Sequence, residues 1–151
     1  MITNEEINRL DEILLLVRAS VGWTAQEFGD KIGVTRQTIN NLETHRRNTH
    51  LTKIQYIAIR SVLDEEIETH KKDTEMLATI LDAFVDRPEK YSDEARMEMY
   101  KKARMLSPAI MNGSCSRKEI SDEWKTVLLA LGIVIAPPIA AATIGYWKKK
   151  L

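Results

Sequence analysis

Residues 24–43 read TAQEFGDKIGVTRQTINNLE, and this stretch decides the fold of the first part of the chain. Thr24 precedes Glu27 by three positions, a capping box in which the hydroxyl and the carboxylate each satisfy a backbone donor at the start of a helix. Gly33 can adopt the left-handed backbone that ends a helix, and Thr35 is a good N-cap for the next one. The pattern therefore predicts a helix-turn-helix, two short helices joined by a tight turn.

The second of these helices has two contrasting sides. Ile39 and Leu42 face inward, and the opposite side carries Arg36, Gln37, Asn40 and Asn41. Arginine can bridge guanine O6 and N7, and glutamine or asparagine can bridge adenine N6 and N7. Polar side chains on an exposed helix face are most often only solvated, but planar, fork-shaped groups suit base edges. We therefore predict that this helix enters the DNA major groove.

The chain resembles the lambda-repressor-like (Cro/repressor-type, XRE-like) helix-turn-helix family over roughly residues 5–63. The matching positions are Thr24, Glu27, Phe28, Gly29, Ile32-Gly33-Val34, Thr35-Arg36-Gln37-Thr38-Ile39, Leu42-Glu43, Arg47, Ile54, Ile57, Ala58 and Leu63. The resemblance implies a five-helix DNA-binding domain over residues 1–65. The DNA-binding residues that it implies are Thr35, Arg36, Gln37, Thr38, Asn40, Asn41, Arg46 and Arg47.

Three positions depart from the family pattern. Ala25 stands where many members carry a glutamine that touches the DNA backbone, and Thr49 replaces a common proline. His45 stands where a glycine usually ends the recognition helix. We therefore expect a loop of different shape after this helix, and a lower affinity than that of the stronger binders.

The charge distribution fits an anionic partner for this region. The chain has 151 residues and is neutral overall, with 22 Lys and Arg against 22 Asp and Glu. From residue 31 to residue 60, only Glu43 opposes the basic residues, which are Lys31, Arg36, Arg46, Arg47, Lys53 and Arg60. A basic region in a neutral chain is typical of nucleic-acid binding, and we expect double-stranded DNA as the partner.

The spacing of apolar residues beyond this domain is helical, and strand signals are weak, so we predict an all-α fold. Residues 66–111 should form a helical segment with one apolar stripe, made of Met76, Leu77, Ile80, Leu81, Phe84 and Val85. Such a stripe must be buried. It can pack on the domain, on the neighbouring Met97, Tyr100 and Leu106, or on a second copy of the chain, and we predict a homodimer.

The C-terminal part of the chain predicts a membrane anchor. Residues 112–125, which begin NGSCS, are expected to form a flexible linker. Thr126–Trp147 then runs for 22 residues without a charge, about 33 Å as a helix, enough for a hydrocarbon core of about 30 Å. A buried core helix is the alternative, and Pro137-Pro138 leaves open a single span or a re-entrant hairpin.

No enzyme is indicated. The sequence has no Walker loop, dinucleotide fingerprint or HExxH pair. His45, His50 and His70 are scattered, and Cys115, the only cysteine, has no nearby base, so we interpret all four as ordinary residues and predict no metal, cofactor or catalytic site. A single cysteine allows no intramolecular disulfide, which fits a reducing compartment.

These observations predict a sequence-specific DNA-binding transcription regulator. We expect it to be dimeric and attached to the cytoplasmic membrane by one C-terminal span, because the N-terminus MITNEEINRL is no secretory signal and leaves the DNA-binding domain in the cytoplasm. Two alternatives remain. One is a membrane adaptor whose helix-turn-helix binds a protein, and the other is a soluble repressor with a buried C-terminal hairpin.

Overall fold

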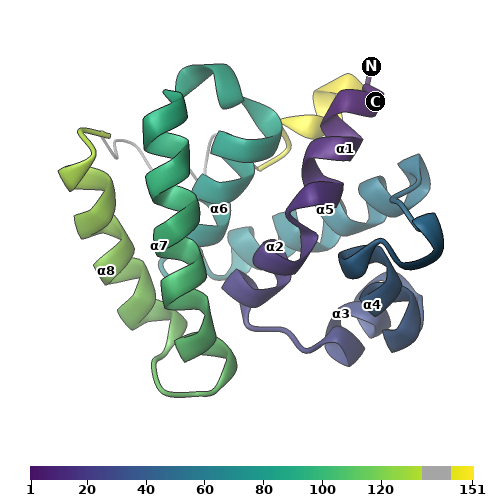
Figure 1. Cartoon of the computed structure of the whole chain (residues 1–151), viewed down its shortest axis with the longest axis horizontal. Helices are drawn as coiled ribbons and strands as arrows, with labels where there is room; N and C mark the ends of the chain where they lie inside the picture. Colours follow the sequence, from purple (N-terminus) through teal and green to yellow (C-terminus); the bar gives the residue numbers. More distant parts are fainter. Residues whose placement is uncertain (134–143) are drawn as a thin grey trace.

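The computed structural model describes residues 1–133 and 144–151, and the predicted all-α class is confirmed there, since no strand occurs among these residues (Figure 1). Short helical turns connect the longer helices. The helices are α1 (Asn4–Glu12), α2 (Leu14–Val21), α3 (Ala25–Ile32), α4 (Arg36–Thr44), α5 (Lys53–Thr69), α6 (Glu75–Leu81), α7 (Asp93–Met111) and α8 (Arg117–Ala130).

The apolar residues at the start of the chain recur at helical spacing, and they lie on two successive helices, α1 and α2. The backbone departs from helical geometry at Ile13, with φ −115°, so that α1 ends and α2 begins at this residue. Leu10 and Val17 are fully buried, one on each side of the break. The break lets α1 pack against the π-helical turn η2 (Asp82–Asp86) while α2 packs against α7 (Figure 1).

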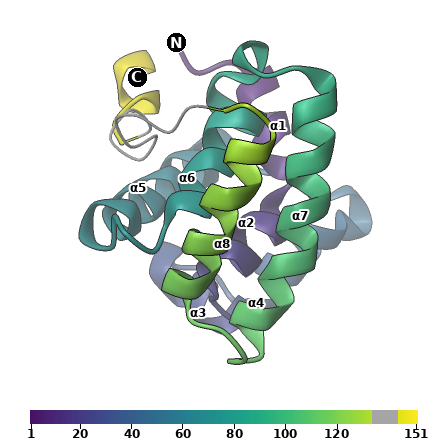
Figure 2. The same cartoon turned by 90° about the vertical axis from the view of Figure 1, so that its left-hand side faces the viewer.

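Helix α6 lies at the centre of the molecule, in contact with α2, α7 and α8 (Figure 2). All seven of its residues are buried. The apolar stripe predicted for this segment therefore packs inside the chain. Its aromatic residue, Phe84, meets Tyr100 of α7 with ring centroids 6.2 Å apart. Because the stripe is covered within one chain, it is not available for contact with a second copy.

A buried ion pair joins the N-terminal helices to the middle segment. Arg60 of α5 donates from Nη1 to Asp86 Oδ1 at 2.6 Å and from Nη2 to Asp86 Oδ2 at 2.9 Å. Both side chains are almost completely excluded from solvent, and Arg60 also donates to the Tyr56 hydroxyl at 3.2 Å. The bidentate geometry compensates two charges that water no longer reaches.

Helix α8 occupies part of the predicted linker and the start of the predicted membrane segment. Ser116 and Glu119 form a capping box, so a helix begins within residues 112–125 and continues to Ala130. Trp124 and Leu128 are fully buried, and α8 packs against α6 and α7 (Figure 2). Residues 126–130 are therefore the last turn of this amphipathic helix, in which Leu128 is buried and Leu129 is 68% exposed.

The end of the predicted membrane segment is also buried in the protein. Trp147 is 1% exposed, its indole Nε1 donates to Asp64 Oδ2 at 2.8 Å, and its ring meets Tyr56 edge-on. Lys150 pairs with Glu6 at 2.7 Å, so the last turn, η4 (Trp147–Lys150), lies against α1 near the N-terminus (Figure 1).

These contacts correct the predicted membrane anchor. Among the residues that the structure describes, no helix combines the length and the apolar character needed to cross a bilayer. The predicted single-pass localisation is therefore wrong, and the lipid bilayer loses its basis as a partner. The predicted break at Pro137-Pro138 lies outside the described residues.

Candidate nucleic-acid interface

The two helices of the helix-turn-helix begin and end where the sequence predicts. Thr24 Oγ1 accepts from the backbone N–H of Glu27 at 3.0 Å, and Thr35 Oγ1 accepts from that of Thr38 at 3.1 Å. Gly33, between α3 and α4, has φ 78°, a left-handed conformation in which glycine is unstrained. Local side-chain chemistry therefore sets the boundaries of both helices.

Gly29 fixes how closely α3 approaches the turn. A Cβ atom on this residue would lie 2.6 Å from the carbonyl oxygen of Val34, far inside a normal contact distance. The obstruction is backbone, which cannot rotate away as a side chain could. Only glycine therefore allows this angle between α3 and α4.

Helix α4 is attached by one side only. Ile39 and Leu42 are fully buried, and the opposite side faces solvent. We call this outer set the α4 surface. Its exposed residues are Thr35, Arg36, Gln37, Asn40, Arg46 and Arg47, and its half-buried residues are Thr38 and Asn41.

The structure thus gathers all eight predicted DNA-binding residues on α4 and the turn that follows it. Gln37 Nε2 donates to Asn41 Oδ1 at 2.9 Å, and the hydroxyls of Thr35 and Thr38 lie 3.0 Å apart. None of these contacts folds the side chains back onto the protein core. Their contact with DNA stays a prediction.

In the folded protein, the acidic residue of this basic region pairs with an arginine from outside the region. Glu43, the acidic residue that opposes the local positive charge in the sequence, accepts two hydrogen bonds from Arg18 of α2, at 2.6 and 2.9 Å. Both side chains are mostly buried. The charges of Arg36, Arg46 and Arg47 consequently remain uncompensated by Glu43.

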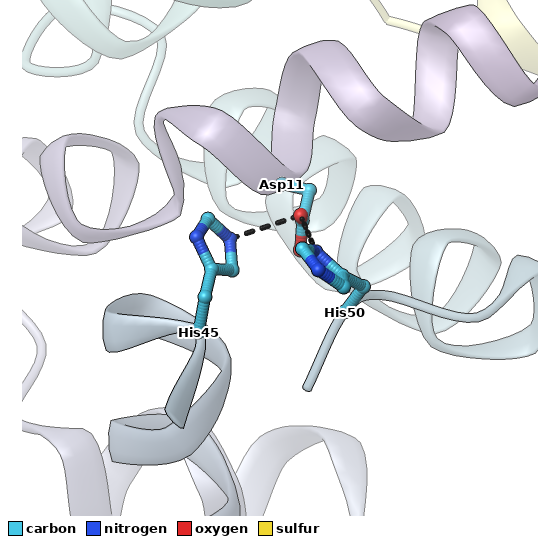
Figure 3. Close-up of side chains that lie close together, drawn as sticks. All are labelled: Asp11, His45 and His50. Carbon is cyan, nitrogen blue, oxygen red and sulfur yellow. Dashed lines mark hydrogen bonds and ion pairs between the residues drawn. The ribbon is translucent and has the colours of Figure 1, made fainter. Parts of the chain in front are cut away.

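The end of α4 shows what the family departure at His45 produces. His45 ends the helix with φ 55°, and Arg47 and Asn48 in the following turn are also left-handed, with φ 56° and 57°. His45 Nε2 lies 2.9 Å from Asp11 Oδ2 of α1, and His50 Nδ1 lies 2.8 Å from the same oxygen (Figure 3). A loop that differs from the family pattern is thereby tied to the first helix.

The sequence analysis missed this Asp11–His45–His50 cluster. Both histidines were interpreted as ordinary residues, and Asp11 was not considered as a ligand. The available signal was the histidine in place of a helix-ending glycine, with a second histidine five residues later. Asp11, more than thirty residues away in the chain, could be found only from the packing of α1 beside the end of α4.

The fold and the geometry of α3 and α4 define a helix-turn-helix, and the comparisons with known proteins agree. The helix-turn-helix family matches residues 14–58, from α2 into α5. The antitoxin HipB of Escherichia coli O6:H1 is 43% identical over 44 residues, 29% of this chain. The match spans 47% of that relative, about half its length. No solved structure matches the chain.

Proposed function

We propose that this chain is a sequence-specific DNA-binding transcription regulator, not an enzyme, and that it inserts α4 into the major groove. The observation that carries the proposal is the α4 surface, where arginine and amide side chains face solvent while Ile39 and Leu42 hold the helix from behind. The helix-turn-helix match over residues 14–58 and the likeness to an antitoxin support it.

Base recognition falls to the residues at the start and middle of α4. Arg36 and Gln37 lie in the first turn, the part of a recognition helix that reaches base edges. The hydrogen bond from Gln37 to Asn41 orders two amides before DNA arrives, which reduces the side-chain entropy lost on binding. We expect Arg36 to read guanine and the amides to read adenine.

Phosphate contact falls to Arg46 and Arg47 in the turn η1 (Arg46–Asn48). Both side chains are exposed, and the turn that carries them follows His45, whose Nε2 lies 2.9 Å from Asp11 Oδ2. Arginines at this place orient the protein on the duplex without reading sequence. Their contribution should fall steeply as the salt concentration rises, because each neutralised phosphate releases counterions.

Homodimerisation is part of the proposal, since one short recognition helix reads few base pairs and a two-fold dimer reads two half-sites. The α6 stripe is covered, so another apolar surface must serve. Leu15 of α2 and Met97 and Met105 of α7 are more than half exposed. Leu15 also lines a groove of about 550 Å³ between α2 and α7, together with Tyr100 and Met111.

The test is selection of DNA by the full chain, followed by mobility shifts on the selected site. We expect Arg36→Ala and Gln37→Ala each to weaken binding by about 1–3 kcal/mol per lost base contact. Lys118→Ala is the control, because Lys118 is exposed and its helix, α8, lies on the opposite side of the molecule from α4 (Figure 1). A selected site with two-fold symmetry would support the dimer.

Two outcomes would contradict the proposal. One is a selection that enriches no sequence. The other is binding that ignores both substitutions on α4. If the protein also showed no salt-dependent affinity for any DNA, the helix-turn-helix would instead have the role of a protein-binding adaptor.

A further inference from the structure

The Asp11–His45–His50 cluster brings three metal-ligating side chains from separate parts of the chain to one point. Asp11 comes from α1, His45 from the end of α4 and His50 from the loop before α5 (Figure 3). One ligand atom from each residue lies within 4.8 Å of the other two. Two imidazoles and a carboxylate form a ligand set typical of Zn²⁺ and related ions.

The hydrogen bonds around His50 leave its inner nitrogen facing an acceptor. Its Nε2 lies 3.0 Å from Asn48 Oδ1, so a neutral ring that donates to this amide carries the lone pair on Nδ1. That nitrogen lies 2.8 Å from the carboxylate oxygen Asp11 Oδ2. In that tautomer, His50 Nδ1 and Asp11 Oδ2 are both acceptors, and a cation, either a proton or a metal ion, is needed to bridge them.

The surroundings of His45 also favour a cation at this place. Its Nε2 is shielded from solvent and hydrogen-bonds to none of the residues that the structure describes, although Asp11 Oδ2 is only 2.9 Å away. The two imidazole rings are stacked, with centroids 4.7 Å apart. A single carboxylate oxygen is thus approached by two ring nitrogens, which is the arrangement that a shared cation stabilises.

The carboxylate is also held in place from outside the cluster. Asp11 Oδ1 accepts from the backbone N–H of Leu51 at 3.0 Å, and Asp11 is buried. Such outer hydrogen bonds orient the ligands in protein metal sites and raise their affinity. Oδ2 is left to face the two histidines.

We propose that Asp11, His45 and His50 bind one divalent ion of the Zn²⁺ class. Tetrahedral coordination with Zn–N and Zn–O distances of about 2.0–2.1 Å separates ligand atoms by about 3.3 Å. The two ring nitrogens lie 2.9 and 2.8 Å from Asp11 Oδ2, slightly closer than this separation, and all three ligand atoms lie within 4.8 Å of one another. Water completes the coordination. This inference does not depend on DNA binding.

The experiment uses the full chain, freed of metal with a chelator and titrated with Zn²⁺ by calorimetry and with Co²⁺ by visible absorption. We expect one ion per chain and a melting temperature raised by roughly 5 °C at saturating Zn²⁺. His45→Gln and His50→Gln should each weaken binding about tenfold or more. His70→Gln is the matched control, because His70 is the other histidine of the chain and lies outside the cluster.

A measurement on the wild-type protein avoids variants that fail to fold. Zn²⁺ should shift the ring ¹⁵N resonances of His45 and His50 and leave those of His70 unchanged. The absence of saturable Zn²⁺ binding would overturn the proposal and leave protons as the cations of the cluster. Binding that survives both glutamine substitutions, or a shift at His70 alone, would overturn it equally.

Discussion

Helices α4 and α6 are both short, but they differ in almost every other respect. All seven residues of α6, EMLATIL, are buried, whereas α4, RQTINNLET, buries only Ile39 and Leu42 among nine. Helix α6 contacts α2, α7 and α8, and α4 contacts mainly α3. The contrast separates two tasks, because α6 stabilises the fold and α4 displays side chains. Changes near α6 should therefore lower stability, and changes on the outside of α4, apart from its N-cap Thr35, should alter binding alone.

The largest effect is expected where the middle segment meets α5. Asp86→Ala leaves the guanidinium of Arg60 buried without its partner, which should lower the free energy of unfolding by about 3–5 kcal/mol. Asp122→Ala on the exposed side of α8 is the control and should change it by less than about 0.5 kcal/mol. Urea unfolding measures both. Equal losses in the two variants would mean that the ion pair is not formed.

A smaller effect is expected at the junction between the buried and displayed parts of α4. Thr35→Ala removes the hydroxyl that accepts from the backbone N–H of Thr38, at a cost of about 1 kcal/mol of stability. Thr35→Ser keeps the hydroxyl and should stay close to the wild type. Thermal unfolding of the two variants distinguishes them, and a serine variant as unstable as the alanine variant would argue against capping.

The smallest effect is a pH dependence of stability that comes from Asp64, which contacts the C-terminal turn. It is measured as the difference in stability between the wild type and a variant of Asp64. Burial raises the pKa of Asp64 above 3.8, although hydrogen bonds from Trp147 and Gly145 act in the opposite direction. The folded state therefore binds this proton more tightly than the unfolded chain does. The stability that this group contributes is present below pH 3.8 and is lost as the pH rises through the higher folded-state pKa.

The corresponding measurement compares wild type with Asp64→Asn, which does not titrate, by urea unfolding across this range. The stability of the wild type relative to the variant should fall as the pH rises. A difference that stays flat, or that grows with pH, would mean that Trp147 does not bury the Asp64 carboxylate.

The helix-turn-helix could be predicted from the sequence because its determinants are local. Thr24, Gly33 and Thr35 act within three or four residues along the chain, and the alternation around Ile39 and Leu42 is visible without tertiary information. The division of the first apolar run into α1 and α2 could not be predicted, because the break at Ile13 follows from packing on two different neighbours.

The membrane prediction failed for a related reason. An uncharged run indicates that water is excluded, but the sequence does not say whether lipid or protein excludes it. Here Leu128 is fully buried in a helix that packs on α6 and α7, and Trp147 donates to a buried carboxylate more than eighty residues away. The burial of Trp147 depends on its partner Asp64, which no pattern in residues 126–147 could reveal.

The left-handed backbone at His45 has a consequence for how the protein could change over time. A glycine there would relax the turn by about 1 kcal/mol, yet it would remove the imidazole that reaches Asp11. The chain tolerates a locally unfavourable conformation and in return couples the end of α4 to α1. Histidine at this position therefore places the end of α4 beside α1, and a relative with glycine there would lack this contact between the recognition helix and the first helix.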